Sequence, residues 1–420
     1  MQRIAVVGSG VAGLSAAWLL KDTADVTVFE KALKAGGHVN TVDVDGIGID
    51  TGFIVHNDRN YPMFRRFLAH LGVTTQPSDM SFAASLAGGR IEWAGDSLSK
   101  LFARRQLLFS PSHWRMLADV VRFNRHAKRL VNDDELPEGS IEEFVAAHYY
   151  GNGLLERYLL PMVGAIWSAP TQSARSFPTA ALLRFFDNHG LLDLTNRPQW
   201  RTIVGGSQRY VDAVAETLGQ RLRLDAHVSA IQRSQERAQV ALADGRTESF
   251  DHVIMACHPP ASRQIVADLD FQETRTLAAF SFTDNRAILH TDAELMPRCR
   301  RAWSSWNYLA KDTATSNSGV SVSYWMNRLQ RLPTTTQYFV SLNPEKTPRS
   351  ECVISEMRYE HPVYDQAAIE AQPTLTDIQG RGGLWHCGAW CANGFHEDGF
   401  ASGVRVAHAL GADTQCVDPP

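Results

Sequence analysis

The chain has 420 residues, of which 44% are hydrophobic and 20% charged, and a formal net charge of −4. This composition excludes an intrinsically disordered chain and is sufficient for two domains that share a large core. The small negative charge excludes a general electrostatic attraction to nucleic acid, and we expect no nucleic-acid partner.

The cysteine pattern and the length of the apolar runs indicate the cellular compartment of the protein. The six cysteines have no spacing typical of a disulfide framework or of a metal site, and they are typical of reduced thiols. The first strand begins close to Met1, so we expect no signal peptide. No apolar run reaches the ~18 residues that cross a bilayer. We therefore expect a cytoplasmic protein, either soluble or peripheral on the inner membrane face.

The first element is a strand, a glycine-rich turn and a helix. Ile4 to Val7 is a short apolar run, and Leu14 to Leu20 continues with helical character. Between them, Gly8 allows a tight turn, Gly10 lets backbone amides approach a pyrophosphate, and Gly13 lets the helix pack close to the strand. The helix N-terminus then faces the phosphates with free N–H groups.

A second strand, Asp25 to Phe29, ends in Glu30, whose carboxylate is placed to accept the ribose hydroxyls and to repel a 2′-phosphate. The alternative is an ordinary tight turn that carries these glycines by chance. The nucleotide interpretation does not by itself distinguish NAD from FAD. The residues expected to contact the nucleotide are Gly8, Gly10, Val11, Ala12, Gly13, Glu30 and Lys31.

Two long inserts follow. Residues 81–204 have a mainly helical pattern, and residues 270–375 contain alternating segments such as Val320 to Trp325 and Tyr338 to Leu342. We expect a helical cap over an antiparallel sheet, with the substrate between them.

Within the first insert, the segment from Ser97 to Leu130 carries eight Lys or Arg residues and one acid. On a helix over residues 113–130, Arg115, Arg122 and Arg129 share one side. Such a basic amphipathic surface is attracted to an anionic membrane, although a solvated helix face is the alternative.

The C-terminal part of the chain carries a second glycine-rich motif, which complements the motif at the N-terminus. Gly388, Ala389 and Trp390 precede Gly399 to Arg405, a glycine-rich approach to a helix that continues to Leu410. With Gly36, Gly37 and His38 and with Asp50, Thr51 and Gly52, this pattern resembles the flavin-containing amine oxidase and phytoene desaturase superfamily. The resemblance implies noncovalent FAD, with the C-terminal helix N-terminus at the flavin and the Phe400 N–H as its donor. The further cofactor residues that it implies are Gly36, Gly37, His38, Asp50, Thr51, Gly52, Val228, Gly388, Gly399, Phe400 and Ser402.

The same resemblance implies an α/β, amine-oxidase-like fold. We expect a Rossmann-type FAD-binding domain from residues 1–80, 205–269 and 376–420. A discontinuous α+β substrate domain, an antiparallel sheet with a helical cap, is expected from residues 81–204 and 270–375.

Five further motifs look like a bacterial subgroup of FAD-binding oxidoreductases that accompany cyclopropane fatty acid synthases. They are Asp50 to Pro62, Pro161 to Pro170, Ala302 to Tyr308, Tyr338 to Pro344 and Phe395 to Gly399. The resemblance implies a fatty-acyl substrate, as in desaturation, oxidation or isomerisation of a phospholipid chain. It also implies a cyclopropane-synthase-like methyltransferase as a partner. Two alternatives remain: a flavin amine oxidase, and a non-catalytic FAD-bound partner of a lipid methyltransferase.

Amine oxidases of the superfamily usually carry a lysine near the flavin, and no lysine aligns here. His38 replaces the usual arginine after the glycine pair, and Ala389 replaces the usual acid. The catalytic candidates are His396, for its titration near neutral pH, His56 and Glu397. Each has a structural alternative: His56 as a core residue, and Glu397 as a first-turn acid that complements the helix dipole.

Overall fold

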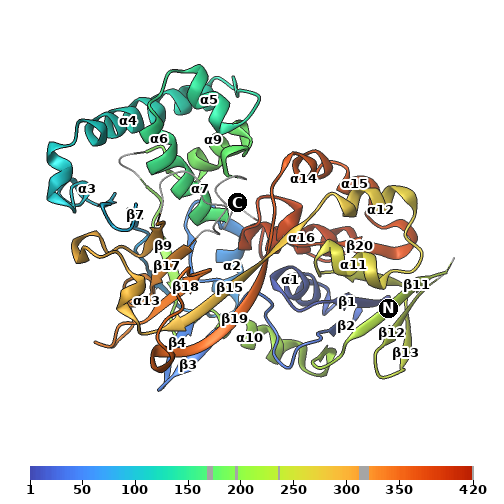
Figure 1. The fold of residues 1–420 in the computed structure, drawn as a ribbon. Coiled ribbons are helices and arrows are strands. Elements are labelled where there is room, and N and C mark those ends of the chain that lie inside the picture. The colour runs from blue at the N-terminus through green and yellow to red at the C-terminus, as the bar shows by residue number, and fades with distance from the viewer. Residues whose placement is uncertain (168–173, 194–196, 235–236, 312–320, 419–420) are drawn as a thin grey trace.

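The computed structural model describes residues 1–167, 174–193, 197–234, 237–311 and 321–418. A five-stranded parallel sheet, in the order β10-β2-β1-β14-β20, brings together three distant parts of the chain (Figure 1). Because its strands are all parallel, their carboxyl ends share one edge, where ligands bind in such sheets. The strands are β1 (Arg3–Val7), β2 (Asp25–Phe29), β10 (Leu222–Arg223), β14 (His252–Met255) and β20 (Leu384–His386).

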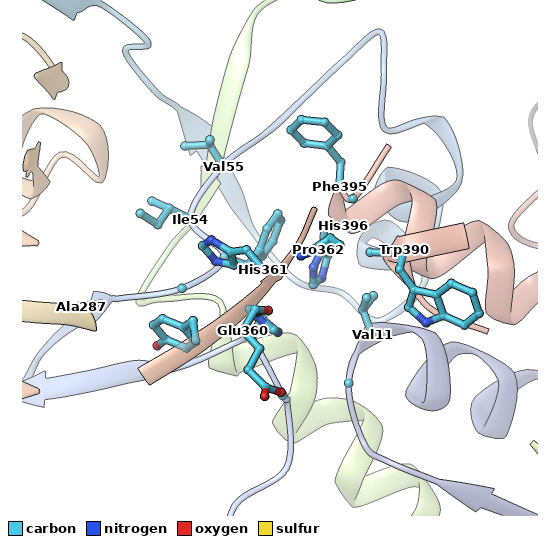
Figure 2. A pocket seen from close by; sticks show the side chains of 18 of the residues that line it. Val11, Ile54, Val55, Ala287, Glu360, His361, Pro362, Trp390, Phe395 and His396 are labelled. Atoms are coloured by element: carbon cyan, nitrogen blue, oxygen red, sulfur yellow. Dashed lines mark hydrogen bonds between the residues drawn. The ribbon is translucent and has the colours of Figure 1, made fainter. Parts of the chain in front are cut away.

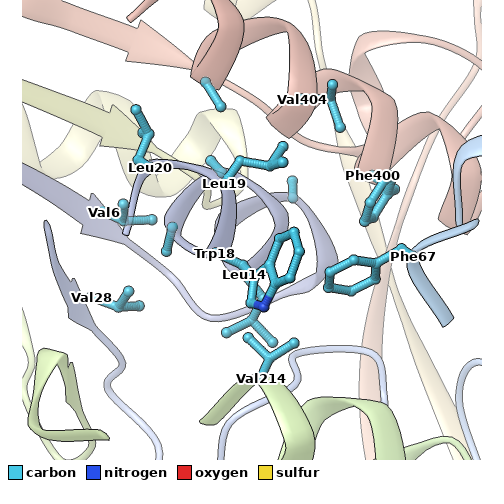
Figure 3. Packing of buried hydrophobic residues seen from close by; sticks show 14 of the residues in the cluster. Val6, Leu14, Trp18, Leu19, Leu20, Val28, Phe67, Val214, Phe400 and Val404 are labelled. Atoms are coloured by element: carbon cyan, nitrogen blue, oxygen red, sulfur yellow. The ribbon is translucent and has the colours of Figure 1, made fainter. Parts of the chain in front are cut away.

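Helices from the two ends of the chain pack against each other beside this sheet. Their close approach requires glycine, because a Cβ on Gly403 would lie 2.2 Å from the Ala12 carbonyl oxygen. Figure 3 shows Trp18, Phe67 and Phe400 packed in the core between the helices. These helices are α1 (Val11–Leu20), α2 (Pro62–His70), α10 (Gln208–Leu218) and α16 (His396–Ala409).

Residues 228–250 form a three-stranded antiparallel meander beside this sheet. The strands are β11 (Val228–Arg233), β12 (Ala238–Leu242) and β13 (Thr247–Phe250). Two small sheets complete this part of the molecule. They contain β3 (Thr41–Val44) with β4 (Ile47–Asp50), and β5 (His56–Asn57) with β9 (Trp200–Ile203) and β6 (Thr75–Pro77).

A seven-stranded mixed sheet, in the order β19-β15-β18-β17-β16-β7-β8, forms the floor of the other half. Two of its strands lie in the first insert, which we expected to be mainly helical. That expectation is wrong for residues 82–94, because the apolar run after Phe82 turns at Gly88 and Gly89 into a hairpin, and its first strand pairs with Trp306 to Leu309. The strands are β7 (Phe82–Leu86), β8 (Ile91–Ala94), β15 (Phe282–His290), β16 (Trp306–Leu309), β17 (Ser321–Trp325), β18 (Phe339–Leu342) and β19 (Val353–Pro362).

A cluster of helices covers this sheet, as expected of a cap (Figure 1). Its core contains Phe123, Phe144, Leu159, Leu182 and Phe186. Residues 168–170 of one motif and Val320 at an expected strand start lie outside the described residues. The cap elements are α3 (Leu98–Leu101), η1 (Arg105–Phe109), α4 (Pro111–Asn132), α5 (Ile141–Ala147), α6 (Asn152–Leu154), α7 (Leu160–Trp167) and α9 (Thr179–Asn188).

Shorter helices connect the remaining strands. They are α11 (Pro259–Ile265), α12 (Phe271–Ala278), α13 (Met326–Leu329), α14 (Gln366–Ala371), α15 (Leu375–Ile378) and η8 (Ala389–Cys391). Among the described residues, no helix has the length and apolarity needed to cross a membrane. The domain boundaries given above stay a prediction.

Candidate functional site

The glycine-rich turn after β1 forms an open cradle at the start of α1. Gly8 has a φ of 108°, and a Cβ there would lie 2.8 Å from the Ala256 carbonyl oxygen. A Cβ on Gly13 would lie only 2.1 Å from the Gly8 carbonyl oxygen, so Gly13 sets the helix against the turn. A Cβ on Gly10, by contrast, would meet no atom within 4 Å. Gly10 therefore faces open space at a helix N-terminus that no side chain caps, which is the arrangement that binds phosphate.

Glu30 lies at the carboxyl end of β2 and lines the same cavity. Its carboxylate is fixed by the Ser9 N–H at 2.9 Å, the Ser9 hydroxyl at 2.6 Å and the Ala32 N–H at 2.9 Å. One oxygen accepts two of these bonds and the other accepts one, so a lone pair remains for a ribose hydroxyl. Val228, at the start of β11, also lines the cavity, as expected for an adenosine contact.

The C-terminal turn lies on the other side of the cradle. Figure 2 shows Val11, at the start of α1, close to Trp390 and His396. Gly388, Ala389, Gly394 and Phe395 also line the cavity. The turn before α16 and the N-terminus of α1 thus enclose one space between them, although they are nearly 400 residues apart in the chain.

The cavity continues under the cap as an apolar chamber. Its total volume is about 1250 Å³, above the ~300–1,000 Å³ typical of a site for one drug-sized ligand. The chamber lies between α7 and α9 on one side and the seven-stranded sheet on the other. Its lining includes Met80, Phe82, Trp93, Tyr158, Met162, Ala165, Ile166, Leu191, Trp306, Tyr324, Val340 and Leu342.

Comparison with known proteins identifies this arrangement. The family model of flavin containing amine oxidoreductases matches residues 11–289, which is more than half of the chain. The chain belongs to this family. A redesigned putrescine oxidase has the same fold, with a TM-score of 0.71 and 16% identity over 97% of this chain and 98% of that one.

Other similar proteins carry names that point to different substrates. The CLA-producing fatty acid isomerase from P. acnes matches with a TM-score of 0.70 and 14% identity over 98% of this chain and 99% of that one. Protoporphyrinogen oxidase 2 of Arabidopsis thaliana is 27% identical over 192 residues, which are 42% of this chain and 35% of that protein. The match to this curated relative therefore spans about a third of its length. Family membership establishes an FAD-dependent oxidoreductase with the amine-oxidase-like α/β fold, and it leaves the substrate open.

The residues of the cradle fit FAD. The open space at Gly10 suits a pyrophosphate, and Glu30 suits the ribose, as the sequence predicted. Gly36 and Gly37 line the cavity with φ values of 128° and 60°, and a Cβ on Gly37 would lie 3.0 Å from the Gly10 Cα. Thr51 and Gly52 line it as well. The remaining expected cofactor residues with cavity contact are Val11, Ala12, Lys31, His38 and Gly388.

Asp50 does not line the cavity, in contrast to the role that the resemblance implied. Its carboxylate is fully buried and accepts hydrogen bonds from Thr41, Gln330 and both the N–H and the hydroxyl of Ser207. Burial raises the Asp50 pKa to about 7. Asp50 therefore ties the strand before Thr51 and Gly52 to the start of α10, and it supports the cofactor site from behind.

The expected role of the C-terminal helix needs a correction. Helix α16 begins at His396, not after Gly399, and the Gly399 N–H bonds to the Phe395 carbonyl oxygen at 3.1 Å. Phe400 is therefore the fifth residue of the helix, and its side chain is fully buried against Phe67. Ser402 accepts a hydrogen bond from the Gly388 N–H at 2.9 Å. Gly399, Phe400 and Ser402 thus shape the turn without lining the cavity, and the helix N-terminus at Phe395 and His396 faces it.

His38, which the sequence pointed to, belongs to a cluster on the cavity wall with His258 and His361, which it did not. His38 donates from Nε2 to the Glu360 carbonyl oxygen at 3.0 Å, and its ring stacks on those of Tyr359 and His361. His258 lies 3.0 Å from the Glu360 carboxylate. Burial lowers the pKa of His38 to about 4 and that of His361 to about 3. His258 follows the carboxyl end of β14, the edge of a parallel sheet where ligands bind, so its position at the cavity was predictable. Nothing in the sequence of β19 indicated that His361, labelled in Figure 2, lies at the cavity.

His396 lines the cavity, but it does not titrate near neutral pH as expected. Its Nε2 lies 2.8 Å from the Tyr210 hydroxyl, and its ring stacks on Phe53 with centroids 3.7 Å apart. Burial, with His56 and His38 nearby, lowers the His396 pKa well below its usual value. The imidazole is therefore neutral in the folded protein, and its contacts position the start of α16 at the flavin.

Glu397 lies outside the main cavity and caps another helix. Its two carboxylate oxygens accept the N–H groups of Met63 at 2.9 Å and Phe64 at 3.0 Å, in the first turn of α2. A carboxylate at a helix N-terminus is stabilising. The geometry therefore gives Glu397 a structural role and not a catalytic one. Its carboxylate caps α2, whereas the alternative expected from the sequence was the dipole of its own helix, α16.

His56 is also a core residue. It is 1% exposed, packs against Tyr61 and Phe64, and does not line the cavity. In the described part of the chain neither ring nitrogen has a hydrogen-bond partner. Burial, with Arg201 and Arg65 nearby, lowers its pKa to about 4. The catalytic interpretation of His56 therefore has no support in the geometry.

This burial predicts the effect of His56→Phe. A pKa lowered in the folded state means that stability from this group is complete above the unfolded value of about 6.5 and is lost as the pH falls toward 4. Between pH 7 and pH 5 the wild type loses ~2 kcal/mol of stability through this group, and the phenylalanine variant lacks this loss. Urea unfolding at pH 7 and pH 5 measures the difference, with the exposed His408→Phe as the matched control. An unchanged pH dependence, or loss of flavin reduction in His56→Phe, would contradict this account.

Cys257 lines the cavity, whereas Cys391 takes no part in the site. Cys391 does not line the cavity, and burial raises its pKa to about 12, so it is not a covalent flavin anchor. Among the described residues, no group of three or more His, Cys, Asp or Glu side chains is arranged to hold a metal ion.

Proposed function

We propose that this protein is an FAD-dependent oxidoreductase that acts on a fatty acyl chain, by desaturation or by a related oxidation or isomerisation. The observation that carries the proposal is the apolar chamber next to the flavin cradle. Met162, Ala165 and Ile166 of α7 face Phe82, Val340 and Leu342 of the sheet across it. A space between two apolar walls suits a hydrocarbon chain, because burial of each methylene contributes ~0.8 kcal/mol.

The same chamber is poorly suited to a small cationic amine. Lys31, at the nucleotide end, is the one lysine among the described cavity residues, so no lysine is placed at the reacting end. Trp306 and Tyr324 lie edge to face, with centroids 4.9 Å apart and planes at 89°, so they leave no slot for an amine between parallel rings. The carboxylates of Asp79 and Asp96 are both bound by Arg328, at 2.9 and 3.0 Å.

When bound, FAD supplies two-electron redox chemistry and accepts a hydride. Desaturation would remove a hydride, which the flavin would accept, and a proton from the adjacent carbon, which the flavin itself or water would accept. A quinone or oxygen must take the electrons after each turnover. Isomerisation returns both hydrogens and needs no oxidant. The chain's own residues exclude water and hold the hydrocarbon against the flavin, and the neutral His396 and the Phe395 turn hold the start of α16.

Anaerobic stopped-flow absorbance tests the proposal. We expect the flavin of the purified protein to be reduced by an unsaturated phospholipid or fatty acid in detergent, and not by putrescine, benzylamine or protoporphyrinogen. Reduction by an amine or by the tetrapyrrole alone would overturn it. Isomerisation would leave the flavin oxidised at the end of each turnover, so the double-bond positions of the incubated lipid are measured as well. No reduction by any of these compounds, together with unchanged double bonds, would instead favour a non-catalytic partner of a lipid methyltransferase.

A further inference from the structure

One segment of the cap exposes large hydrophobic side chains to solvent. Leu98 is 82% exposed, Phe109 87%, Trp114 51% and Leu108 41%. These four residues, here called the apolar tip, lie on α3, η1 and the first turn of α4. Figure 1 places α3 at the edge of the molecule opposite β11 to β13. Exposed apolar side chains gathered on one segment mark an interaction surface, whereas single ones do not.

The tip is held in a defined shape by the residues beneath it. Trp114 donates from Nε1 to the Leu108 carbonyl oxygen at 2.9 Å and packs against Phe102 with centroids 4.7 Å apart. His113 Nε2 lies 2.9 Å from the Leu101 carbonyl oxygen. The exposed rings are therefore presented by a packed scaffold, and their exposure is not the result of a frayed end.

The charge around the tip has one sign. Residues 97–118 contain Lys100, Arg104, Arg105 and Arg115 and no Asp or Glu, in a chain whose net charge is −4. Lys100 pairs with Asp96 and Arg104 with the buried Glu92, which leaves Arg105 and Arg115 as exposed cations at the tip.

The basic face expected along the whole of α4 is not uniform. Arg122 is held by Asp119 at 3.1 Å and by the Tyr149 carbonyl oxygen at 3.1 Å, and its guanidinium lies 4.1 Å from the Tyr150 ring centroid. Lys128 is paired with Asp193. Arg125 and Arg129 are exposed, but among the described residues no large exposed apolar side chain of α4 accompanies them. The described surface that combines exposed cations with exposed apolar side chains is therefore the apolar tip and not the middle of the helix.

We propose that the apolar tip docks the protein on the surface of an anionic phospholipid bilayer. Leucine, phenylalanine and tryptophan side chains insert at the boundary between headgroups and acyl chains, and the flanking arginines attract anionic headgroups. Charge complementarity favours this occupant, because the exposed Arg105 and Arg115 attract anionic headgroups while the apolar side chains between them enter the bilayer.

The tip also adjoins the cavity. Gly95 and Asp96 line the cavity and are exposed, and they directly precede Ser97 and Leu98. Docking through the tip brings this rim of the cavity to the bilayer. Bringing the rim to the bilayer gives the cavity access to lipid, and this advantage rests on the proposed acyl substrate. The docking itself does not depend on that substrate.

Co-sedimentation of the FAD-loaded protein with vesicles tests the docking. We expect binding to vesicles of phosphatidylcholine with phosphatidylglycerol, weaker binding to phosphatidylcholine alone, and weakening by salt. Leu98→Asp with Phe109→Asp lowers binding by about tenfold or more, and Arg105→Glu with Arg115→Glu lowers it on the anionic vesicles. The matched controls are Phe271→Asp and Arg275→Glu, at exposed positions of α12, which leave binding unchanged.

No wild-type binding to anionic vesicles would overturn the proposal, and so would equal binding by the tip variants and the α12 controls. Flavin absorbance verifies that each variant is folded. Flavin reduction by lipid in detergent needs no vesicle, so it tests the proposed function independently of docking. A variant that no longer binds vesicles but is still reduced by lipid has lost only the docking function of the tip.

Discussion

Gly10→Val is expected to abolish FAD binding in a chain that still folds. The Gly10 backbone, with φ −68° and ψ 176°, is open to any residue, and a Cβ there meets no protein atom within 4 Å. The valine side chain therefore costs the fold only ~1 kcal/mol as a poorer N-cap. It fills the space in which the phosphates would lie, so the affinity for FAD falls about 100-fold or more, ~2.7 kcal/mol.

Fluorescence titration of the FAD-free protein measures this affinity, and circular dichroism reports the fold. Gly95→Val is the matched control, because a Cβ there meets only Trp93, at 4.0 Å, at the far end of the cavity. Gly13→Val should instead prevent folding, because its Cβ would lie 2.1 Å from a backbone oxygen. Circular dichroism should therefore show loss of structure in this variant and not in Gly10→Val. Tight FAD binding by Gly10→Val would mean that the cradle is not where the pyrophosphate lies.

Met80→Lys is expected to keep FAD and lose the acyl reaction. Met80 is partly buried, lines the chamber and packs on the core below the sheet. Lysine has a similar length, so it fits, but an acyl chain would have to strip water from its ammonium group. That desolvation costs several kcal/mol, and the rate of flavin reduction by lipid should fall about 100-fold or more.

Met80→Leu is the matched control and should react within a few fold of the wild type, because hydrophobic exchanges of similar volume are tolerated. Single-turnover stopped-flow absorbance compares the three proteins at equal flavin content. Equal rates for Met80→Lys and Met80→Leu would place the substrate outside the chamber.

The nucleotide half was predictable from the sequence because its signals are local. The strand, the glycine turn, the helix and the acid at the end of β2 follow one another within thirty residues, and each has its own physical requirement. The strand at Asp25 to Phe29 is confirmed with the same bounds. The choice of FAD followed from the pairing of two terminal motifs, and family membership confirms FAD.

The catalytic candidates were less predictable because their roles depend on residues far along the chain. Glu397 looked available until the fold placed it on Met63 and Phe64, more than 330 residues away. His396 looked titratable because the sequence does not show burial by Phe53 and Tyr210. The helical pattern of the first insert likewise concealed β7, whose partner β16 lies over 200 residues later.

Mass spectrometry of acyl chains tests the central claim most directly. Lipids are extracted from cells that produce the wild type and from cells that produce Gly10→Val, which lacks the cofactor. The account predicts acyl species in the wild-type cells alone that are either two hydrogens lighter or unchanged in mass with a displaced double bond. Identical acyl profiles in the two strains, with equal amounts of folded protein, would contradict it.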